Sequence, residues 1–577
     1  MGNIAQLIGT VDQIRQNSKF YSGLPPRRIH RSLGQLPHVT IQMPVYKEGL
    51  RSVIEPTIRS IKAAMSTYEL QGGTANIFIN DDGMRYLSDE EAKERKNFYE
   101  ENGIGWVARP KHNPKPSVPG EAPFLRRGKF KKASNLNYGL WVSVTVEDRL
   151  SRVHRHDTWT QQDENAAYDQ ILQDVSAASL GETWAEGNIR IGDYILLIDS
   201  DTRVPGDCLL DAVSEMESSP QVAIIQYSSG VMNVTNNFFE RGITFFTNLV
   251  YTQIRYAVAN GDVAPFVGHN AIIRWTAVQD VAFYCGLDKR EKYWSECTVS
   301  EDFEMALRLQ NDGYIIRLAA YKGDGFKEGV SLTVYDELTR WEKYAFGCSE
   351  LIFHPISQWP RHGPFTSLFL KFLCSRIPLP SKITIMAYIG TYYALGSAWI
   401  TTVLNYFIVG WYNGFFDHYY IDSFRVAFSI IIVFTALGNV ALVTFRYRIK
   451  ENSLGGAAKE NIKWIPLLIV FLGGVSLHIS QALVSHLLGI DMTWGATAKE
   501  VEDVGFFEEI PRVLKRFKWT FIFCIVSAVA MMLLGLGPVP PLWRIGFFTA
   551  VWPMAVVIVC HFLLPIVLNP NLMLFTW

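Results

Sequence analysis

The distribution of hydrophobic residues divides the chain into two parts near residue 380. Before this point, short apolar runs alternate with stretches of helical spacing, and most charged residues lie here. The pattern then changes to apolar runs long enough to cross a bilayer, at residues 383–411, 424–445, 518–536 and 545–568. We therefore expect a soluble domain followed, over residues 382–577, by a membrane domain with about four helical spans.

The soluble half is predicted to alternate strands with helices. Its apolar runs predict strands at residues 39–46, 75–80, 106–109 and 193–198, and helical spacing predicts helices at 54–68, 88–101 and 135–144. This order is typical of βαβ units and predicts an α/β domain over residues 37–335 with a mixed or parallel sheet. Residues 146–190 are polar and weakly periodic, so we expect a partly helical surface insert, or alternatively a regulatory or partner-binding element.

Two acidic residues follow the most apolar strand of this half. Residues 195–198 are all aliphatic, which suits a strand buried on both faces, and Asp199 and Asp201 come directly after it. Ligands of open α/β sheets bind at the carboxyl ends of strands. Two carboxylates one residue apart can bind a divalent cation that also holds a diphosphate. The alternative is a solvated turn, because Asp-x-Asp is common in loops.

Charge in the loops of the membrane half predicts its orientation. Five cations lie close together and place their loop in the cytoplasm: Arg446, Arg448, Lys450, Lys459 and Lys463. Residues 411–422 have no Lys or Arg and are expected outside, so the soluble domain is cytosolic. Residues 464–490 contain His478 and His486, and we expect an interfacial amphipathic helix there rather than a span. Residues 336–381 are also predicted to be interfacial, and residues 1–36 form an amphipathic N-terminal segment.

Composition excludes several other classes of protein. The formal net charge of −1 gives no reason to expect a nucleic-acid partner. The seven cysteines form no Cys-x-x-Cys pair, which argues against a structural zinc site. No apolar h-region follows the N-terminus, so no secretory signal peptide is expected.

Short motifs occur along the chain in a specific order: Pro44-Val45-Tyr46-Lys47-Glu48, Asp81-Asp82-Gly83, Lys132-Ala133-Ser134-Asn135, Asp199-Ser200-Asp201, Gly268-His269-Asn270, Ser300-Glu301-Asp302 and Glu337-Leu338-Thr339-Arg340-Trp341. Over residues 39–500 this order resembles membrane-embedded family-2 glycosyltransferases that extend polysaccharides, the cellulose synthase, hyaluronan synthase and chitin synthase group. The resemblance is nearest to fungal cellulose-synthase-like type 2 glycosyltransferases. Residues 491–500 resemble the gating loop of cellulose synthases.

The resemblance implies a GT-A-like domain that binds a UDP-sugar. Asp199 and Asp201 would hold Mg²⁺ or Mn²⁺ on the donor diphosphate, with Asp199 also contacting the donor. Asp81 or Asp82 would contact the uracil and ribose, although Asp-Asp-Gly alone is an ordinary turn. Three further residues would complete the donor site: Tyr46, Glu48 and Lys132, the last as a phosphate contact. Thr497 and Lys499 would close over the donor phosphates.

The acceptor side is also implied by the resemblance. Asp302 would be the general base that takes a proton from the acceptor hydroxyl, oriented by Glu301. The residues around Ser300 would equally make a good helix start. Arg340 would pair with the diphosphate and Trp341 would stack on the acceptor sugar; the alternative is that the pair anchors a helix at the membrane interface. The remaining predicted substrate contacts are Glu337, His269 and Asn270; a packed loop is the alternative for His269.

The chain departs from the family pattern at several positions. Glu337 stands where these enzymes usually carry Gln, and Ser300 where Thr is usual. Trp494 and Ala496 replace the usual Phe and Val of the gating loop. No apolar span precedes the catalytic domain, so the pore would be smaller or would be completed by a homo-oligomer or accessory subunits.

These features together predict an integral membrane enzyme, placed in the plasma membrane if its product leaves the cell. It would be an inverting glycosyltransferase that extends a β-linked polysaccharide from a UDP-sugar, with UDP-glucose favoured, and translocates it. Its partners would be the UDP-sugar, the growing glycan and membrane lipid. The alternatives are a UDP-GlcNAc-using chitin- or hyaluronan-type synthase, a single-transfer enzyme acting on a lipid acceptor, and a non-catalytic membrane scaffold.

Overall fold

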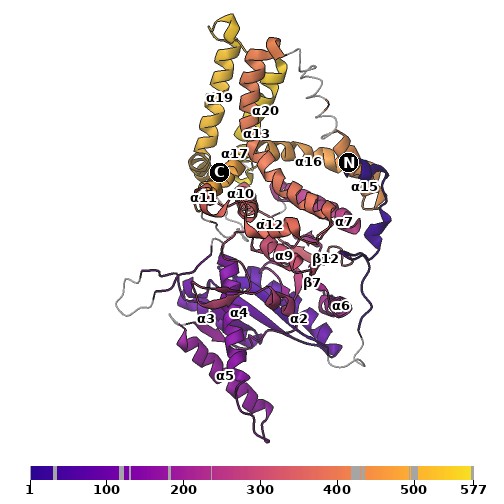
Figure 1. The fold of residues 1–577 in the computed structure, drawn as a ribbon, viewed down its shortest axis with the longest axis vertical. Helices are drawn as coiled ribbons and strands as arrows, with labels where there is room; N and C mark the ends of the chain where they lie inside the picture. The colour runs from indigo at the N-terminus through magenta and orange to yellow at the C-terminus, as the bar shows by residue number, and fades with distance from the viewer. Residues whose placement is uncertain are drawn as a thin grey trace.

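A soluble α/β domain and a group of long helices make up the two ends of the molecule, as Figure 1 shows for the computed structural model of the chain. Helices that lie between these two ends connect them (Figure 1). The structure describes residues 2–29, 36–115, 123–128, 131–179, 183–235, 237–416, 429, 436–492, 494 and 505–573.

Within the described part of the chain, the soluble domain is built on a nine-stranded mixed sheet with the order β1-β12-β7-β9-β6-β2-β3-β4-β5. In chain order these strands are β1 (Tyr21–Ser22), β2 (His38–Val45), β3 (Thr74–Asp81), β4 (Gly105–Ala108), β5 (Trp184–Glu186), β6 (Tyr194–Leu197), β7 (Val222–Tyr227), β9 (Ala271–Arg274) and β12 (Ile315–Ala319). Strand β9 is antiparallel to both of its neighbours, β6 and β7. The residues before β9 therefore lie at the same edge of the sheet as the residues after β6.

Helices cover both faces of the sheet, which confirms the predicted α/β fold. One face packs on α2 (Glu55–Leu70), α3 (Asp89–Glu101) and α6 (Cys208–Glu217), and the other on α4 (Lys131–Leu150), α8 (Trp275–Asp280) and α9 (Glu301–Asn311). The start of α3 is the predicted one: Ser88 and Glu91 form a capping box, in which each residue accepts from the backbone of the other.

Strand β2 combines alternating apolar and polar residues with burial of nearly its whole length. It lies between β6 and β3 in the middle of the sheet, and helices cover both of its faces. Its polar side chains therefore bond across strands instead of facing water: Thr40 Oγ1 donates to Asn76 Oδ1 over 2.8 Å and Gln42 Nε2 to Asn80 Oδ1 over 2.9 Å. The polar residues that alternate with apolar ones in β2 are therefore buried and hydrogen-bonded to the neighbouring strand.

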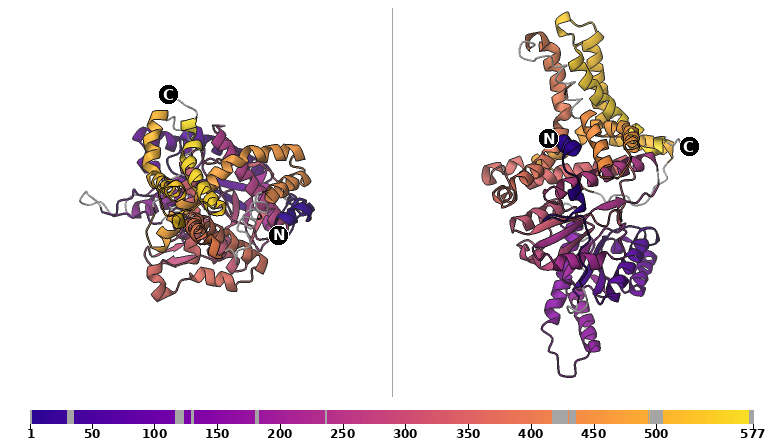
Figure 2. Two further views of the ribbon diagram at one scale, coloured as in Figure 1. Left: turned by 90° about the horizontal axis from the view of Figure 1, so that it is seen from above. Right: turned by 90° about the vertical axis from the view of Figure 1, so that its right-hand side faces the viewer.

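The segment predicted as a surface insert contains its own helix and a strand of the sheet. Helix α5 (Gln161–Ala178) packs its apolar residues Tyr168, Leu172 and Val175 against α4, and β5 pairs with β4 at the sheet edge. Figures 1 and 2 show α4 and α5 extending away from the long helices. The weak hydrophobic pattern arises because α5 buries only one narrow stripe.

The N-terminal segment joins the two halves of the molecule. Strand β1 pairs with β12 at one edge of the sheet. The sequence could not predict this strand, because two residues are too few to show a hydrophobic pattern. Helix α1 (Gly2–Ile8) packs on α15 (Leu437–Arg448), where the Arg448 guanidinium donates to the carbonyls of Gln6, Leu7 and Gly9. Arg448 thus caps the C-terminus of α1.

Among the described residues, four helices are long and apolar enough to cross a membrane: Leu379–Tyr412, Leu454–Leu487, Lys518–Leu536 and Phe548–Val567. Three of them coincide with predicted spans. They lie in α13 (Leu379–Phe416), α19 (Lys518–Leu536) and α20 (Phe548–Val567), and Figure 1 draws all three side by side at the top of the molecule. Half of the span predicted at residues 424–445 lies outside the described residues.

The fourth apolar segment includes most of the predicted interfacial helix. It consists of α16 (Leu454–Gly474) and α17 (Ser476–Leu487), separated at Val475. In Figure 1, α16 lies across the direction of α13, α19 and α20. This orientation is what an interfacial helix would have, and the interfacial assignment stays a prediction.

We predict that Arg448→Ala will release α1 from α15, because three carbonyls lose a charged donor. Amide hydrogen exchange of residues 2–9 is expected to rise about tenfold or more, with little change in the sheet. Arg15→Ala is the control, since the exposed Arg15 makes only a 3.4 Å contact with the Ile449 carbonyl. Equal exchange in both variants would show that Arg448 does not hold this helix.

Candidate active site

The ammonium group of Lys132 joins the two segments that meet at the carboxyl end of β6. Its Nζ lies 2.6 Å from Asp199 Oδ1 and donates to the carbonyl of Gly268 over 3.1 Å. Asp199 follows β6 and Gly268 precedes β9, so the antiparallel pairing of these strands brings both residues to Lys132 at the start of α4. Burial disfavours charge on Lys132, but Asp199, Glu301 and Asp302 together outweigh it, and the net effect is a raised pKa.

Asp302 lies on the other side of the same glycine. Gly268 has φ of +77°, and a Cβ atom built on it would lie 3.1 Å from Asp302 Oδ2. Asp302 and Glu301 both favour charge on Lys132, so three carboxylates, including that of Asp199, stabilise the charged ammonium group. The structure therefore brings together the two acids, Asp199 and Asp302, that are predicted to flank the donor.

Glu301 is a buried acid of this group with a raised pKa. It is buried at the start of α9, and its Oε2 has no hydrogen-bond partner in the described part of the chain. Burial raises the pKa of Glu301 to about 7, with Lys343 acting in the opposite direction. Lys343 lies on α10 (Val334–Ile352), and its pKa is lowered by burial despite the nearby Glu301 and Asp302. This lysine is missing from the sequence prediction, although it lies one helical turn after Arg340.

The Arg-Trp pair is held by the residue that departs from the family pattern. Glu337 is 4% exposed, accepts from Trp341 Nε1 over 2.9 Å, and lies 3.5 Å from Arg340 Nη1 through its other oxygen. Arg340 also donates to Ser331 Oγ and Tyr344 Oη. A glutamate at this position can accept from both side chains, one with each carboxylate oxygen.

A second glutamate, Glu328, whose side chain is 14% exposed, organises the loop before β9. It ends β13 (Phe326–Glu328), accepts from Tyr251 Oη over 3.1 Å, and lies 3.2 Å from His269 Nδ1. Asn270 is fully buried and donates to Ser229 Oγ and Glu328. Burial raises the pKa of Glu328, and His269 and Arg340 oppose this shift. His269 and Asn270 are thus held by protein groups, which agrees with the packed-loop alternative for His269.

Asp81 and Asp82 form ion pairs inside the domain. Asp81 is fully buried and pairs with Arg95 Nη1 at 3.0 Å, while Tyr99 Oη donates to it over 2.9 Å. Burial raises the pKa of Asp81, and Arg95 opposes the shift. Asp82 pairs with both nitrogens of the Arg109 fork, at 2.6 and 2.8 Å. Both carboxylates fix the ends of β2 and β3, and their predicted contact with a nucleoside stays a prediction.

The remaining predicted residues fall into two groups. Tyr46 is 38% exposed and faces Tyr86 with ring centroids 6.4 Å apart, and Glu48 accepts from its backbone N–H over 2.6 Å. Thr497 and Lys499 lie outside the described residues, as does Ala496. Trp494 at the start of this segment packs its ring 5.5 Å from that of Phe346.

The donor set at Asp199 and Asp201 fits a metal that arrives with its ligand. In the described ranges of the chain, no group of three or more His, Cys, Asp or Glu side chains is arranged to hold a metal ion. Mg²⁺ is commonly held by one or two carboxylates while phosphate oxygens and water complete its shell. The two carboxylates match that mode better than a preformed cage.

Comparison with known proteins identifies one domain of the chain. Residues 194–414 match the model of the family described as Glycosyl transferase family group 2. This match begins at β6 and includes Asp199, Asp302 and Arg340. Over residues 194–414, the match agrees with the predicted resemblance to family-2 glycosyltransferases.

Curated relatives agree with this family. Glucans biosynthesis glucosyltransferase H of Xanthomonas campestris is 30% identical over 160 residues, which are 27% of this chain and 24% of the relative. The protein of the same name from Xylella fastidiosa is 30% identical over 31% of this chain and 29% of its own length. That from Cereibacter sphaeroides is 28% identical over 35% of this chain and 32% of its own length. The chain thus spans only about a quarter to a third of the relatives that it matches.

A solved mannosyltransferase of Pyrobaculum calidifontis, in complex with GDP-Man and Mn²⁺, aligns with 81% of this chain and 91% of its own. Its identity is 13% and its TM-score 0.36, and so distant a likeness carries no weight for the site.

We predict that Glu301→Gln will change how stability depends on pH. Between the ordinary glutamate pKa of 4.5 and about 7, the folded chain keeps a proton that the unfolded chain has lost. Stability of the wild type therefore falls as pH rises through this window, and the neutral Gln does not contribute to this fall. The stability difference, variant minus wild type, is expected to rise by about 2–3 kcal/mol from about pH 5 to about pH 8.

Thermal unfolding in detergent at both pH values measures this difference. Glu100→Gln is the matched control, because Glu100 is exposed on α3. A pH-independent difference for Glu301→Gln would show that Glu301 is not held with a raised pKa.

Proposed function

We propose that the chain is an inverting glycosyltransferase that transfers a sugar from a UDP-sugar to a growing β-linked glycan. The observation that carries the proposal is the convergence of Asp199, Gly268 and Asp302, all inside the matched region, on Lys132 at one edge of the sheet. Acids with a cation between them suit a reaction in which one end of the substrate loses a proton and the other develops negative charge.

In the proposed reaction, Asp302 accepts the proton of the acceptor hydroxyl. The acceptor oxygen then forms a bond to the anomeric carbon as the bond from that carbon to the diphosphate breaks. One displacement without a covalent intermediate inverts the configuration. Lys132 and Arg340 stabilise the charge of the departing UDP. A divalent ion held by Asp199 and Asp201 would supply Lewis-acid stabilisation of the same diphosphate.

Glucose is the sugar that we favour for the donor. The support is the name of the curated relatives, glucans biosynthesis glucosyltransferase H, over the part of the chain that they share.

Tyr46 and Tyr86 form an exposed aromatic pair near the end of β2, which offers a surface on which a uracil ring can stack.

Extension and translocation of the glycan are supported by the position of Trp341. Its ring lies 5.6 Å from that of Phe471 on α16 and 6.3 Å from that of Tyr392 on α13. An acceptor sugar next to Trp341 would thus adjoin two helices that are apolar enough to lie in the membrane. Aromatic rings are common partners of sugar faces, so this cluster is suited to guide a glycan from the site to the helices.

A direct test is incorporation of radiolabelled UDP-glucose or UDP-GlcNAc by the purified full chain with Mg²⁺ or Mn²⁺. We expect glucose in an insoluble, glucanase-sensitive product, and Asp302→Asn is expected to lose about 100-fold or more of the rate because the base is removed. Label in a chitinase-sensitive product would change the donor assignment. Label in lipid alone would show single transfer, and full activity of Asp302→Asn would contradict the assigned base.

We further predict that Gly268→Ala will reduce the rate by about 10- to 100-fold, because a methyl group there displaces Asp302. Gly261→Ala is a matched control: Gly261 has φ of +102°, but its added Cβ would meet no atom within 4 Å. Both variants carry a similar backbone penalty of about 1 kcal/mol. Equal rates for the two variants would mean that the contact between Gly268 and Asp302 is not needed for transfer.

A further inference from the structure

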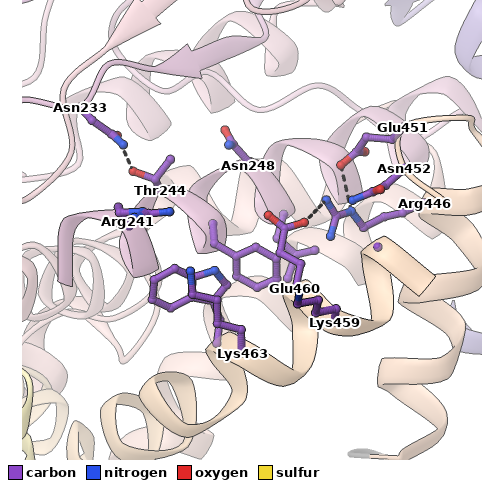
Figure 3. Close-up of a pocket in the computed structure, with 14 residues that line it drawn as sticks. Asn233, Arg241, Thr244, Asn248, Arg446, Glu451, Asn452, Lys459, Glu460 and Lys463 are labelled. Atoms are coloured by element: carbon purple, nitrogen blue, oxygen red, sulfur yellow. Dashed lines mark hydrogen bonds and ion pairs between the residues drawn. The ribbon is translucent and has the colours of Figure 1, made fainter. Parts of the chain in front are cut away.

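A polar cavity lies away from the acidic cluster, between α7 (Phe238–Ala259) and the junction of α15 with α16. Its volume is about 480 Å³, which is enough for a small ligand. Figure 3 shows side chains from all three helices directed into it. None of the residues assigned above to donor, acceptor or metal lines this cavity.

Positive charge exceeds negative charge among the lining residues. The cavity is lined by four cations, Arg241, Arg446, Lys459 and Lys463, and by two acids, Glu451 and Glu460. Both acids pair with Arg446, at 2.9 and 2.8 Å. The other three cations form no ion pair with a described residue, so the cavity keeps a net positive charge.

One guanidinium nitrogen of Arg446 makes no hydrogen bond to a described residue. The residue is only 8% exposed, and its Nη1 has no acceptor among the described residues. A buried guanidinium nitrogen without a partner is costly, and an anionic oxygen in the cavity would satisfy it. The planar fork of arginine matches the oxygens of a phosphate group.

Aromatic side chains form one wall of the cavity. The rings of Phe245 and Trp464 are stacked, with centroids 6.4 Å apart and an interplanar angle of 25°. Lys463 Nζ lies 4.6 Å from the Trp464 ring centroid, and the Arg446 guanidinium 5.8 Å from that of Phe245. These contacts hold two cations at the cavity wall and reduce the flexibility of Lys463.

We propose that this cavity is a binding site for a phosphate-bearing anion, which Arg446, Lys459 and Lys463 contact. The phosphate can belong to an anionic lipid, because α16 continues from this cavity into apolar sequence, or to a soluble phosphorylated compound from the cytosol. Helix α7 connects the cavity to the candidate active site, since Tyr251, about one turn after Asn248, donates to Glu328. A ligand here is therefore placed to influence the loop that holds His269 and Asn270.

The test compares two sources of phosphate on the purified full chain. In one arm, thermal unfolding in detergent is followed with inorganic phosphate and with glycerol 3-phosphate. In the other, it is followed in nanodiscs of phosphatidylcholine with and without phosphatidylglycerol. We expect a saturable rise of the unfolding temperature in at least one arm, and an affinity at least about tenfold weaker in Lys459→Ala/Lys463→Ala.

The double variant is suitable because both lysines are exposed and their removal leaves the ion pairs of Arg446 intact. Lys515→Ala/Lys518→Ala removes two exposed lysines outside the cavity and is expected to behave as wild type. A response in the soluble arm alone assigns a soluble ligand, and a response in the lipid arm alone assigns a lipid. The proposal is overturned if the wild type responds in neither arm, or if the double variant responds as the wild type does.

Discussion

The contact of Lys132 with Asp199 and the Gly268 carbonyl is the interaction on which the candidate active site depends. Three carboxylates, Asp199, Glu301 and Asp302, come close together here, and without a cation they would repel one another. Lys132 reaches them from the start of α4 because β9 runs antiparallel to β6 and turns its preceding loop toward the same edge of the sheet. Charge balance and strand direction together create the site.

The acids of the domain have two different physical roles. Asp81 and Asp82 form ion pairs with Arg95 and Arg109, respectively, and hold the ends of two strands in place. Asp199 and Asp302 lie beside one lysine, Lys132. A metal-bound diphosphate can take the place of its ammonium group next to these acids, or bind the same ammonium group. Asp81 and Asp82 thus stabilise the fold, whereas Asp199 and Asp302 are charged groups that can interact with a substrate.

Sequence patterns predicted β2, β3, β4, β6, α2, α3 and the middle of α4, because regular elements with one or two buried faces leave a clear period, but they gave no prediction for β7, β9 or β12. They also predicted that Asp199 and Asp302 would meet, through the order of the motifs. They could not indicate β1, which is too short for a pattern, or the burial of Asp81. Glu328 and Lys343 were missed because their importance arises from contacts between residues far apart in the chain.

Helix α10 carries Glu337, Arg340, Trp341 and Lys343 on successive turns, and it packs along α17. A helix is stiff along its axis, and each residue advances it by about 1.5 Å. A slide of α10 against α17 by that amount would shift the guanidinium, the indole and the ammonium together. Such a shift would couple the positions of these side chains to the positions of the apolar helices that pack on α10.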